Sequence, residues 1–234
     1  FILLALAVAA VSAQVLNPAE PALNMDLIHH INSVQSNWVA GVNENLVGLT
    51  LGDIQEKRLR VLPREEPVLD LPIVSYPNFK SSESFNGYEK WGKCAHPIRN
   101  QGHCGSCWAF GASEALSDRV CIEEGVDVVL SAQQLVSCDS GNMGCNGGWL
   151  DVAWRYMASE GLVEDSCYPY TSGDGGKSGE CHSSCTGSGD WKKYHATGVH
   201  QVGKNQEAIK ADVEQHGPAE VAFTVYEDFM NYKS

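Results

Sequence analysis

The run from Gln101 to Phe110 holds the residue types that nucleophilic attack by a thiol requires. Cys107 stands near the start of a predicted helix, where the positive end of the helix dipole favours thiolate over thiol. A thiolate is the nucleophile that acyl transfer needs. The side-chain amide of Gln101 and the backbone N–H of Cys107 could stabilise the oxyanion that forms in such an attack. The run therefore indicates a cysteine nucleophile with Gln101 as the oxyanion donor.

The spacing of Cys104 and Cys107 also fits two other kinds of site. A Cys-x-x-Cys pair is typical of redox centres and of half a zinc site. A thioredoxin-like motif should follow a strand in a βαβ unit, and none is evident here. A zinc site needs a second pair of ligands, for which residues 181–185 are the only candidate. Both alternatives stay open on the residues alone, although catalysis is favoured.

Several predicted elements position this run. Apolar spacing and helix-forming residues predict a helix over 106–121, and Ser131 with Gln134 forms a capping box for a helix over 132–136. Further helices are predicted over 149–159 and over 206–216, the second stopped by Gly217-Pro218. Apolar residues alternate over 219–226, which predicts a strand. Helices before strands indicate an α+β protein with two unlike halves.

Composition excludes several classes of protein. The chain has 29 acidic against 16 basic residues and a net charge of −13, which argues against a nucleic-acid partner. Its 43% hydrophobic content is too high for a disordered acidic tail, yet no stretch reaches the roughly 20 apolar residues of a membrane span. Nine Cys favour an oxidising compartment, and the odd number leaves one thiol unpaired.

The front of the chain is typical of a secretory signal peptide. Residues 1–13 are an apolar run that ends in Ser12-Ala13, so we expect Gln14 to be the new N-terminus after cleavage. The alternative is a buried helix. Since there is no initiator Met and no charged n-region, we expect that the start of the signal peptide is missing from this sequence.

Residues 14–80 differ from the rest of the chain. All nine Cys lie after residue 80, and a Pro-rich stretch over 63–77 reads as an extended linker. Short helices are predicted over 25–34 and over 51–59. This segment is interpreted as a removable pro-segment, with an ordinary N-terminal subdomain as the alternative. Residues 81–234 form the main domain.

The residues from Gln101 to Phe110 resemble the nucleophile segment of the papain family of cysteine peptidases, whose Cys-Gly-Ser-Cys-Trp core they contain. Cys145-Asn146-Gly147-Gly148 resembles the family's segment that binds substrate backbone. Gly217-Pro218 before an apolar strand also looks like the family. Three further segments resemble its cathepsin B-like members: Phe110–Cys121, Trp38–Gly41 and Val225–Ser234. The likeness covers roughly residues 25–60 and 81–234.

The resemblance implies a papain-like two-lobed fold. Its helical lobe would carry the Cys107 helix, its β-rich lobe would be incomplete here, and a short helical propeptide would precede both. Such a propeptide lies across the cleft, opposite in direction to substrate, and blocks the cleft until removed. We expect its end near Lys80, within about ten residues. By resemblance Cys107 is the nucleophile, Gln101 forms the oxyanion hole, and the substrate-binding residues are Gly147, Gly148 and Trp108.

The resemblance also implies a pairing of the cysteines that leaves Cys107 free. The implied disulfides are Cys94–Cys121, Cys104–Cys145, Cys138–Cys181 and Cys167–Cys185. The occluding loop of cathepsin B, whose His pair holds a substrate's terminal carboxylate, has no counterpart, because residues 168–180 contain no His. His182 is interpreted as a surface residue. We therefore expect an open cleft and endopeptidase action rather than removal of C-terminal dipeptides.

The general base is not found in this sequence. The family places its catalytic His about 130–150 residues beyond the nucleophile, and an Asn that orients it follows. We expect both beyond Ser234, so the sequence is interpreted as a piece at both ends and as inactive by itself. No histidine fits a family motif for the base; these are His29, His30, His96, His103, His182, His195, His200 and His216.

The sequence thus predicts a cysteine-type endopeptidase made as a zymogen in the secretory pathway, for a lysosome, a vacuole or the extracellular space. We expect peptide or protein substrates, the propeptide as an inhibitor, a monomer, and no metal or organic cofactor. One alternative is an inactive homologue that serves as an extracellular binding or matrix protein. Another is a disulfide-stapled module with no enzymatic ancestry.

Overall fold

The computed structural model describes residues 17–62 and 71–234. The described chain divides into two compact units: residues 17–54 with 226–234, and residues 55–225. The predicted signal peptide over 1–13 lies outside the described residues, as does most of the predicted linker. The second unit carries the candidate site.

The first unit joins the N-terminal segment to the end of the chain. Its helix α1 (Met25–Val34) has the predicted bounds and is capped by Asn24, whose side chain accepts from the N–H of Leu27 at 3.0 Å. Helix α2 (Leu51–Lys57) starts in this unit and ends two residues before the predicted position, and the short 3₁₀ turns η1 (Glu44–Leu46) and η5 (Glu227–Asn231) complete the unit. The N–H of Val39 donates to the carbonyl of Ser234 at 2.6 Å, so the last residue of the chain is bonded to the backbone of the N-terminal segment.

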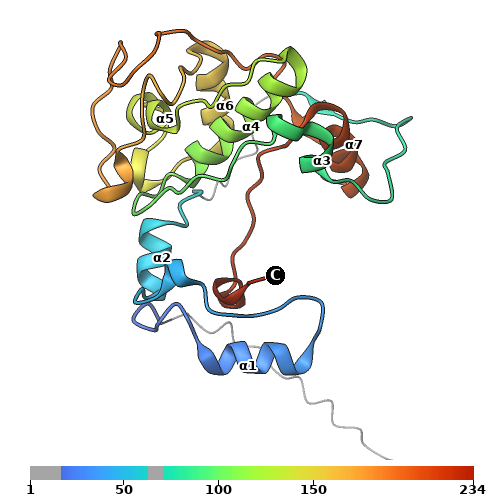
Figure 1. Cartoon of the computed structure of the whole chain (residues 1–234), viewed down its shortest axis with the longest axis vertical. Helices are drawn as coiled ribbons and strands as arrows, with labels where there is room; N and C mark the ends of the chain where they lie inside the picture. The colour runs from blue at the N-terminus through green and yellow to red at the C-terminus, as the bar shows by residue number, and fades with distance from the viewer. Residues whose placement is uncertain (1–16, 63–70) are drawn as a thin grey trace, which may run out of the picture. The chain divides into compact units, whose positions relative to one another are not determined.

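The second unit is built around helix α4, as Figure 1 shows. Helix α4 (Cys107–Glu124) packs against α5 (Ala132–Cys138) and α6 (Leu150–Ser159). The other elements are α3 (Gly87–Trp91), α7 (Gln206–His216) and the 3₁₀ turns η2 (Gly92–Cys94), η3 (Gly144–Asn146) and η4 (Ser172–Asp174). The core between the three packed helices includes Trp108, Leu116, Leu130, Leu135 and Met157, which are buried.

The four helices predicted for the second unit are present, and their ends have local causes. Helix α4 ends at Gly125, which has a φ of 71° that a side chain would disfavour. The side chain of Ser131 accepts from the N–H of Gln134 at 3.0 Å and caps α5 as predicted. The reciprocal bond of a capping box is absent, because the Gln134 amide instead donates to the carbonyl of Gly161 at 2.9 Å. Gly217 ends α7 with a φ of 106°.

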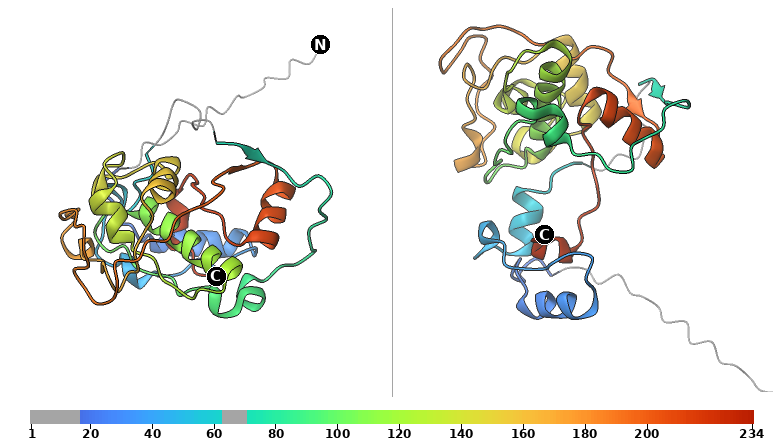
Figure 2. Two further views of the ribbon diagram at one scale, coloured as in Figure 1. Left: turned by 90° about the horizontal axis from the view of Figure 1, so that it is seen from above. Right: turned by 45° about the vertical axis from the view of Figure 1, so that its right-hand side comes forward.

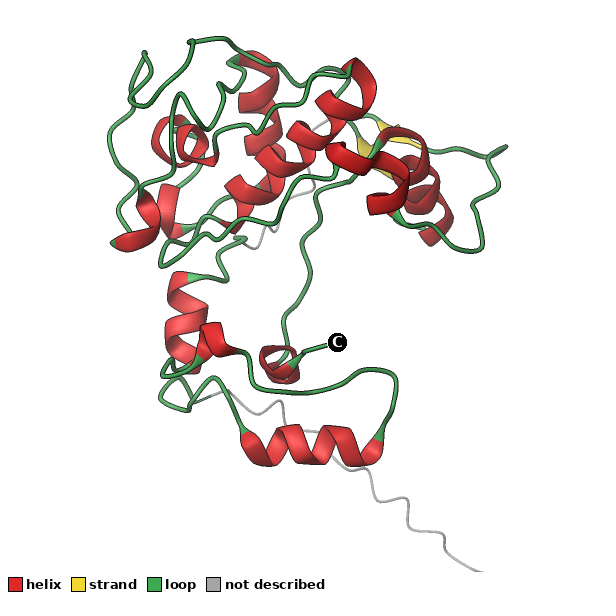
Figure 3. Cartoon of the chain, viewed as in Figure 1, coloured by secondary structure: helices red, strands yellow, loops and turns green. Residues whose placement is uncertain are grey.

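Strands are few in the described residues, as Figure 3 shows. The two-residue strands β1 (Ile73–Val74) and β2 (Gln201–Val202) form one parallel pair. The strand predicted over 219–226 is wrong for this structure: residues 219–225 are not assigned to a strand, and Val221 and Phe223 are each 64% exposed. A strand requires a partner for its backbone ladder, and the described chain offers none at this place.

Four disulfides staple the second unit, and they join the pairs that the resemblance implied. They are Cys94–Cys121, Cys104–Cys145, Cys138–Cys181 and Cys167–Cys185. Cys107 is the free cysteine of the described chain. The Cys104–Cys145 bridge matters most for the site, because it ties the loop before α4 to the turn that carries Gly147 and Gly148.

Candidate active site

Cys107 is the first residue of α4, and a tyrosine braces the loop that leads to it. Ser106 precedes the helix, and its carbonyl accepts from the N–H of Phe110 at 3.0 Å. The Tyr170 hydroxyl donates to the carbonyl of Gln101 at 2.8 Å, which leaves it free to accept from the Ser106 hydroxyl, also at 2.8 Å. Tyr170 therefore fixes Gln101 and the start of α4 relative to each other.

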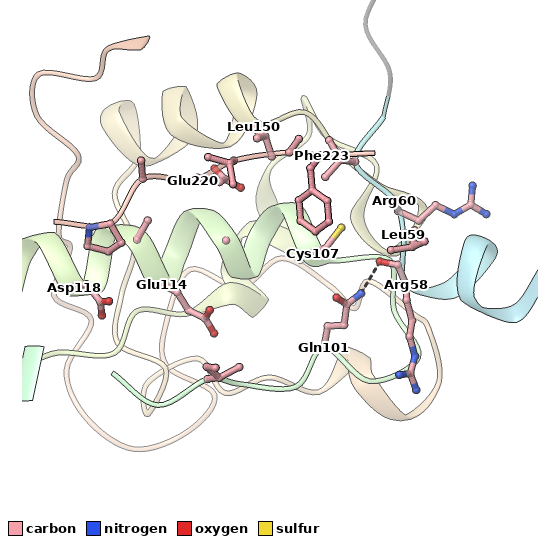
Figure 4. A pocket seen from close by; sticks show the side chains of 18 of the residues that line it. Arg58, Leu59, Arg60, Gln101, Cys107, Glu114, Asp118, Leu150, Glu220 and Phe223 are labelled. Atoms are coloured by element: carbon pink, nitrogen blue, oxygen red, sulfur yellow. Dashed lines mark hydrogen bonds between the residues drawn. The ribbon is translucent and has the colours of Figure 1, made fainter. Parts of the chain in front are cut away.

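The Gln101 amide points at backbone carbonyl oxygens. Its Nε2 donates to the carbonyl of Cys104 at 2.8 Å and to the carbonyl of Arg58 at 3.1 Å. Figure 4 shows the second of these bonds, with Cys107 beside it. An amide N–H held in this way can equally donate to the oxyanion of a tetrahedral intermediate.

A stretch of chain over 58–62, here termed the covering segment, runs over Cys107. The N–H of Gly148 donates to the carbonyl of Arg60, and the N–H of Leu62 donates to the carbonyl of Gly148, both at 3.0 Å. The bridge between Val61 and Gly148 is parallel. The N–H of Arg60 also donates to the sulfur of Cys107. The covering segment thus occupies the backbone groups and the thiol that an extended peptide would need.

The pKa of the Cys107 thiol is raised in this structure. Burial is the main cause, and it outweighs the backbone N–H groups of Arg60 and Trp108, which lower the pKa. The Glu220 carboxylate raises it further when it is ionised. The sequence predicted the opposite, a thiolate favoured by the helix dipole. The difference arises because loss of water disfavours the charged form more strongly than the helix start stabilises it.

Gly148 has no room for a side chain. A Cβ on Gly148 would lie 2.6 Å from the indole ring of Trp108, and one on Gly147, which has a φ of 113°, would lie 2.5 Å from the carbonyl oxygen of Arg60. These contacts show why glycine is required where a peptide backbone approaches closely.

Trp108 itself is not on the cleft surface. Its side chain is fully buried, and its Nε1 donates to the carbonyl of Gly144 at 3.1 Å. The resemblance implied that Trp108 binds substrate. The structure instead places Trp108 where it cannot contact substrate. Its ring lies against Gly148 and supports it.

A cavity of about 630 Å³ opens beside Cys107. Its lining includes Gly111 and, labelled in Figure 4, Gln101, Leu150, Glu220 and Phe223. It lies along one side of α4, which brings the thiol and the cavity wall together.

Glu220, in the wall of this cavity, is a partly exposed residue with a buried carboxyl oxygen, and no sequence signal marked it. Trp154 donates from Nε1 to Oε2 at 2.6 Å, while Oε1 is buried with no hydrogen-bond partner. Oε1 lies 2.9 Å from the place that a Cβ on Gly111 would occupy, so the carboxyl group rests against α4. Burial raises the pKa of Glu220 to about 8. The group is therefore mainly protonated at neutral and acidic pH.

The described histidines do not act on Cys107. None is among the groups that shift the pKa of its thiol. Three of them face acids elsewhere: His96 bonds Asp118 at 2.6 Å, His200 bonds Asp212 at 3.1 Å and His216 lies 3.5 Å from Glu123. Within residues 17–62 and 71–234 no histidine takes the place of a general base.

The redox and zinc alternatives find no support in the described residues. Cys104 is bonded to Cys145 rather than to Cys107, and the candidate zinc ligands Cys181 and Cys185 are each in a disulfide. No cluster of His, Cys, Asp and Glu in the described chain is suited to a metal ion.

None of the described helices has the length and hydropathy for crossing a membrane.

Comparisons with known proteins agree with the geometry. Residues 82–234 match the family model described as papain family cysteine protease. Cathepsin B-like CP3 of Giardia intestinalis is 37% identical over 220 residues, which are 92% of this chain and 73% of that protein. Cathepsin B-like cysteine proteinase 4 of Caenorhabditis elegans is 30% identical over 263 residues, 97% of this chain and 78% of its own length. The structure of proCathepsin B S9 from Trypanosoma congolense superposes with a TM-score of 0.81 at 28% identity, over 91% of this chain and 76% of that one.

Proposed function

Because this chain belongs to the papain family of cysteine proteases, we propose that it is the zymogen of an endopeptidase whose nucleophile is Cys107. The chain is a cathepsin B-like hydrolase with a papain-like α+β fold. The observation that carries the proposal is the covering segment, which meets both the thiol of Cys107 and the amide of Gln101.

The chemistry would proceed through an acyl-enzyme. The thiolate of Cys107 attacks the carbonyl carbon of the scissile peptide bond, and the electron pair of the C=O bond moves to oxygen. The Gln101 amide and the N–H of Cys107 donate to this oxyanion. Collapse of the intermediate expels a protonated amine and leaves a thioester, which water then hydrolyses to release the acid and the thiol.

Both proton transfers need a general acid–base group, which in this chemistry is an imidazole. The described chain holds no histidine at Cys107. We therefore expect a polypeptide of these 234 residues alone to bind peptides and react with electrophiles, yet to hydrolyse no peptide bond at a measurable rate.

The direction of the covering segment supports its role as an inhibitor. Its pairing with Gly148 is parallel, whereas the resemblance implies that substrate runs the opposite way. A chain that runs in reverse does not present its carbonyl carbons to Cys107 in the productive orientation, so it blocks the cleft without being cut. This agrees with a pro-segment over residues 14–80, whose end we expect within about ten residues of Lys80.

The support for endopeptidase action and for a secretory destination comes mainly from features of the sequence. Residues 168–180 hold no histidine that could anchor a terminal carboxylate. Four disulfides suit a protein of an oxidising compartment, and the apolar residues 1–13 are the proposed signal peptide.

The nucleophile assignment is tested by covalent labelling. A peptidyl epoxide is added to the full chain before and after digestion with a trace of papain, which is then removed, and the labelled residue is found by mass spectrometry. We expect labelling only at Cys107, a marked increase after digestion, and none in Cys107→Ser. Rapid labelling of the undigested chain would contradict inhibition by the covering segment, and an unreactive Cys107 after loss of residues 58–62 would contradict its role as nucleophile.

The endopeptidase proposal has a separate binding test that needs no catalysis. The Cys107→Ala chain, digested in the same way, is titrated with one peptide that carries either a free or an amidated C-terminus. An open cleft predicts equal affinities. A strong preference for the free carboxylate would contradict it.

A further inference from the structure

Two parts of the second unit that precede residue 83 contact the rest of that unit at different places. The covering segment meets Cys107, Gln101 and Gly148 at the start of α4. Residues 72–82, here termed the retained segment, contact α7, β2 and the residues around them. Figure 2 shows β1 of this segment beside β2 and near α7.

The backbone of the retained segment is paired with the rest of the second unit, residues 83–225, here termed the catalytic unit. The N–H of Gln201 donates to the carbonyl of Pro72 at 2.9 Å, and the N–H of Gly203 donates to the carbonyl of Val74 at 3.2 Å. These bonds form the strand pair β1–β2. Among the described residues, β2 has no strand partner other than β1. Loss of the retained segment would leave the edge of β2 without a partner.

Tyr76 completes the surroundings of a buried aspartate. Its hydroxyl donates to Oδ1 of Asp212 at 2.7 Å, and the Asp212 side chain is fully buried. The same carboxylate meets Arg119 of α4 at 2.5 Å and His200 at 3.1 Å. Burial and the bond to Asp212 raise the pKa of Tyr76 to about 12, so the hydroxyl keeps its proton. The ring of Tyr76 also lies 5.8 Å from that of His216, centroid to centroid.

Ser82 fixes the other end of the retained segment. Its N–H and its hydroxyl each donate to the Glu214 carboxylate at 2.9 Å. Glu214 lies on α7, two residues after Asp212. Pro72, Val74, Tyr76 and Ser82 thus all hold the retained segment to the catalytic unit, and none of these contacts involves Cys107 or Gln101.

Activation requires the covering segment to leave, because it occupies the thiol. It does not require the retained segment to leave, and removal of that segment would deprive a buried, ion-paired carboxylate of a hydrogen bond. We propose that residues 72–82 stay on the catalytic unit after processing, so that the zymogen is cut upstream of Pro72 rather than at Lys80. This proposal rests on the proposed function, since it assumes that a pro-segment is removed.

The boundary is tested on the full chain with a trace of papain as the processing enzyme. Processed protein is defined as folded material in which Cys107 has become reactive to an epoxide, and its N-terminus is read by Edman degradation and intact mass. We expect a first residue at or before Pro72. A first residue after Pro72 in this material overturns the proposal. If Cys107 never becomes reactive although residues 58–62 are gone, the proposed function fails, and the boundary is decided by the next measurement.

The second measurement uses trypsin on the undigested chain and follows cleavage after Lys80. Tyr76→Phe removes the hydroxyl only, and Tyr88→Phe is the matched control, since Tyr88 is 64% exposed. Cleavage of a transiently opened segment tracks its open population. We expect Tyr76→Phe to raise the rate about tenfold, equivalent to about 1.4 kcal/mol, and Tyr88→Phe to leave it unchanged. Glu214→Ala should raise it as well. Equal rates in wild type, Tyr76→Phe and Glu214→Ala overturn the proposal, because the retained segment would then not be anchored.

Discussion

Replacement of Glu220 by glutamine should abolish a loss of stability that the wild-type chain suffers as pH rises. The pKa of Glu220 is raised from 4.5 to about 8 by burial, with one oxygen bonded to Trp154 and the other without a partner. Between these two values the folded chain keeps the proton on Glu220, whereas the unfolded chain loses it. Raising the pH therefore favours the unfolded state, and stability falls across this range.

The size of the effect follows from the shift. One pKa unit corresponds to about 1.36 kcal/mol, so an increase from pH 5 to pH 7.5 should remove about 3 kcal/mol through Glu220 alone. Glutamine has nearly the same shape, accepts the Trp154 bond through its Oε1 and does not titrate. At pH 5, where the glutamic acid is protonated, the two chains should have similar stability.

Urea unfolding at pH 5 and at pH 7.5 measures the effect directly. We expect the change in unfolding free energy between the two pH values to be smaller by about 3 kcal/mol in Glu220→Gln than in wild type. Glu83→Gln removes a charge from an exposed position and is the control, which should behave as wild type. An identical pH dependence in wild type and Glu220→Gln would refute the reasoning, since Glu220 would then titrate as an exposed acid does.

Two further substitutions test the construction of the site. Tyr170→Phe removes the hydroxyl that binds Gln101 and Ser106, and it should lower the unfolding free energy by about 1–3 kcal/mol, measured by urea unfolding; no change would show that the brace is absent. Gly148→Ala places a Cβ 2.6 Å from the Trp108 ring, so it should lower the thermal midpoint and speed epoxide labelling of Cys107 in the undigested chain; labelling as slow as in wild type would contradict the role of Gly148 in holding the covering segment.

The helices could be predicted because their signals are local. The Ser131 cap and the Gly217-Pro218 stop lie within a few residues of the turns that they control, and the bounds of α1 and α7 agree with the prediction. The strand over 219–226 could not be predicted in this way. Alternation shows which side chains share a face, but a strand also needs a partner from elsewhere in the chain, and the described residues supply none.

The sequence indicated which residue types make up the candidate site, but it did not indicate that the site is covered or that the Cys107 thiol is protonated. Cys107, Gln101 and Gly148, which the motifs singled out, each contact the covering segment. Burial of the thiol reverses the direction of its pKa shift, and a sequence does not show which segment will cover a residue. The raised pKa of Glu220 could not be predicted either, because a single acid in an apolar run carries no local signal that its carboxyl group is buried.

The central claim is that the covering segment keeps Cys107 as an unreactive thiol, and the pH dependence of its alkylation tests this most directly. The rate of iodoacetamide reaction is followed from pH 4 to pH 10 for the full chain and for the chain freed of residues 58–62, with Cys107→Ser as the blank. The account predicts slow alkylation with a raised apparent pKa in the full chain, and faster alkylation with a lower apparent pKa once the segment is gone. Identical pH–rate profiles for the two forms would contradict it, because the covering segment would then have no effect on the pKa or the reactivity of the Cys107 thiol.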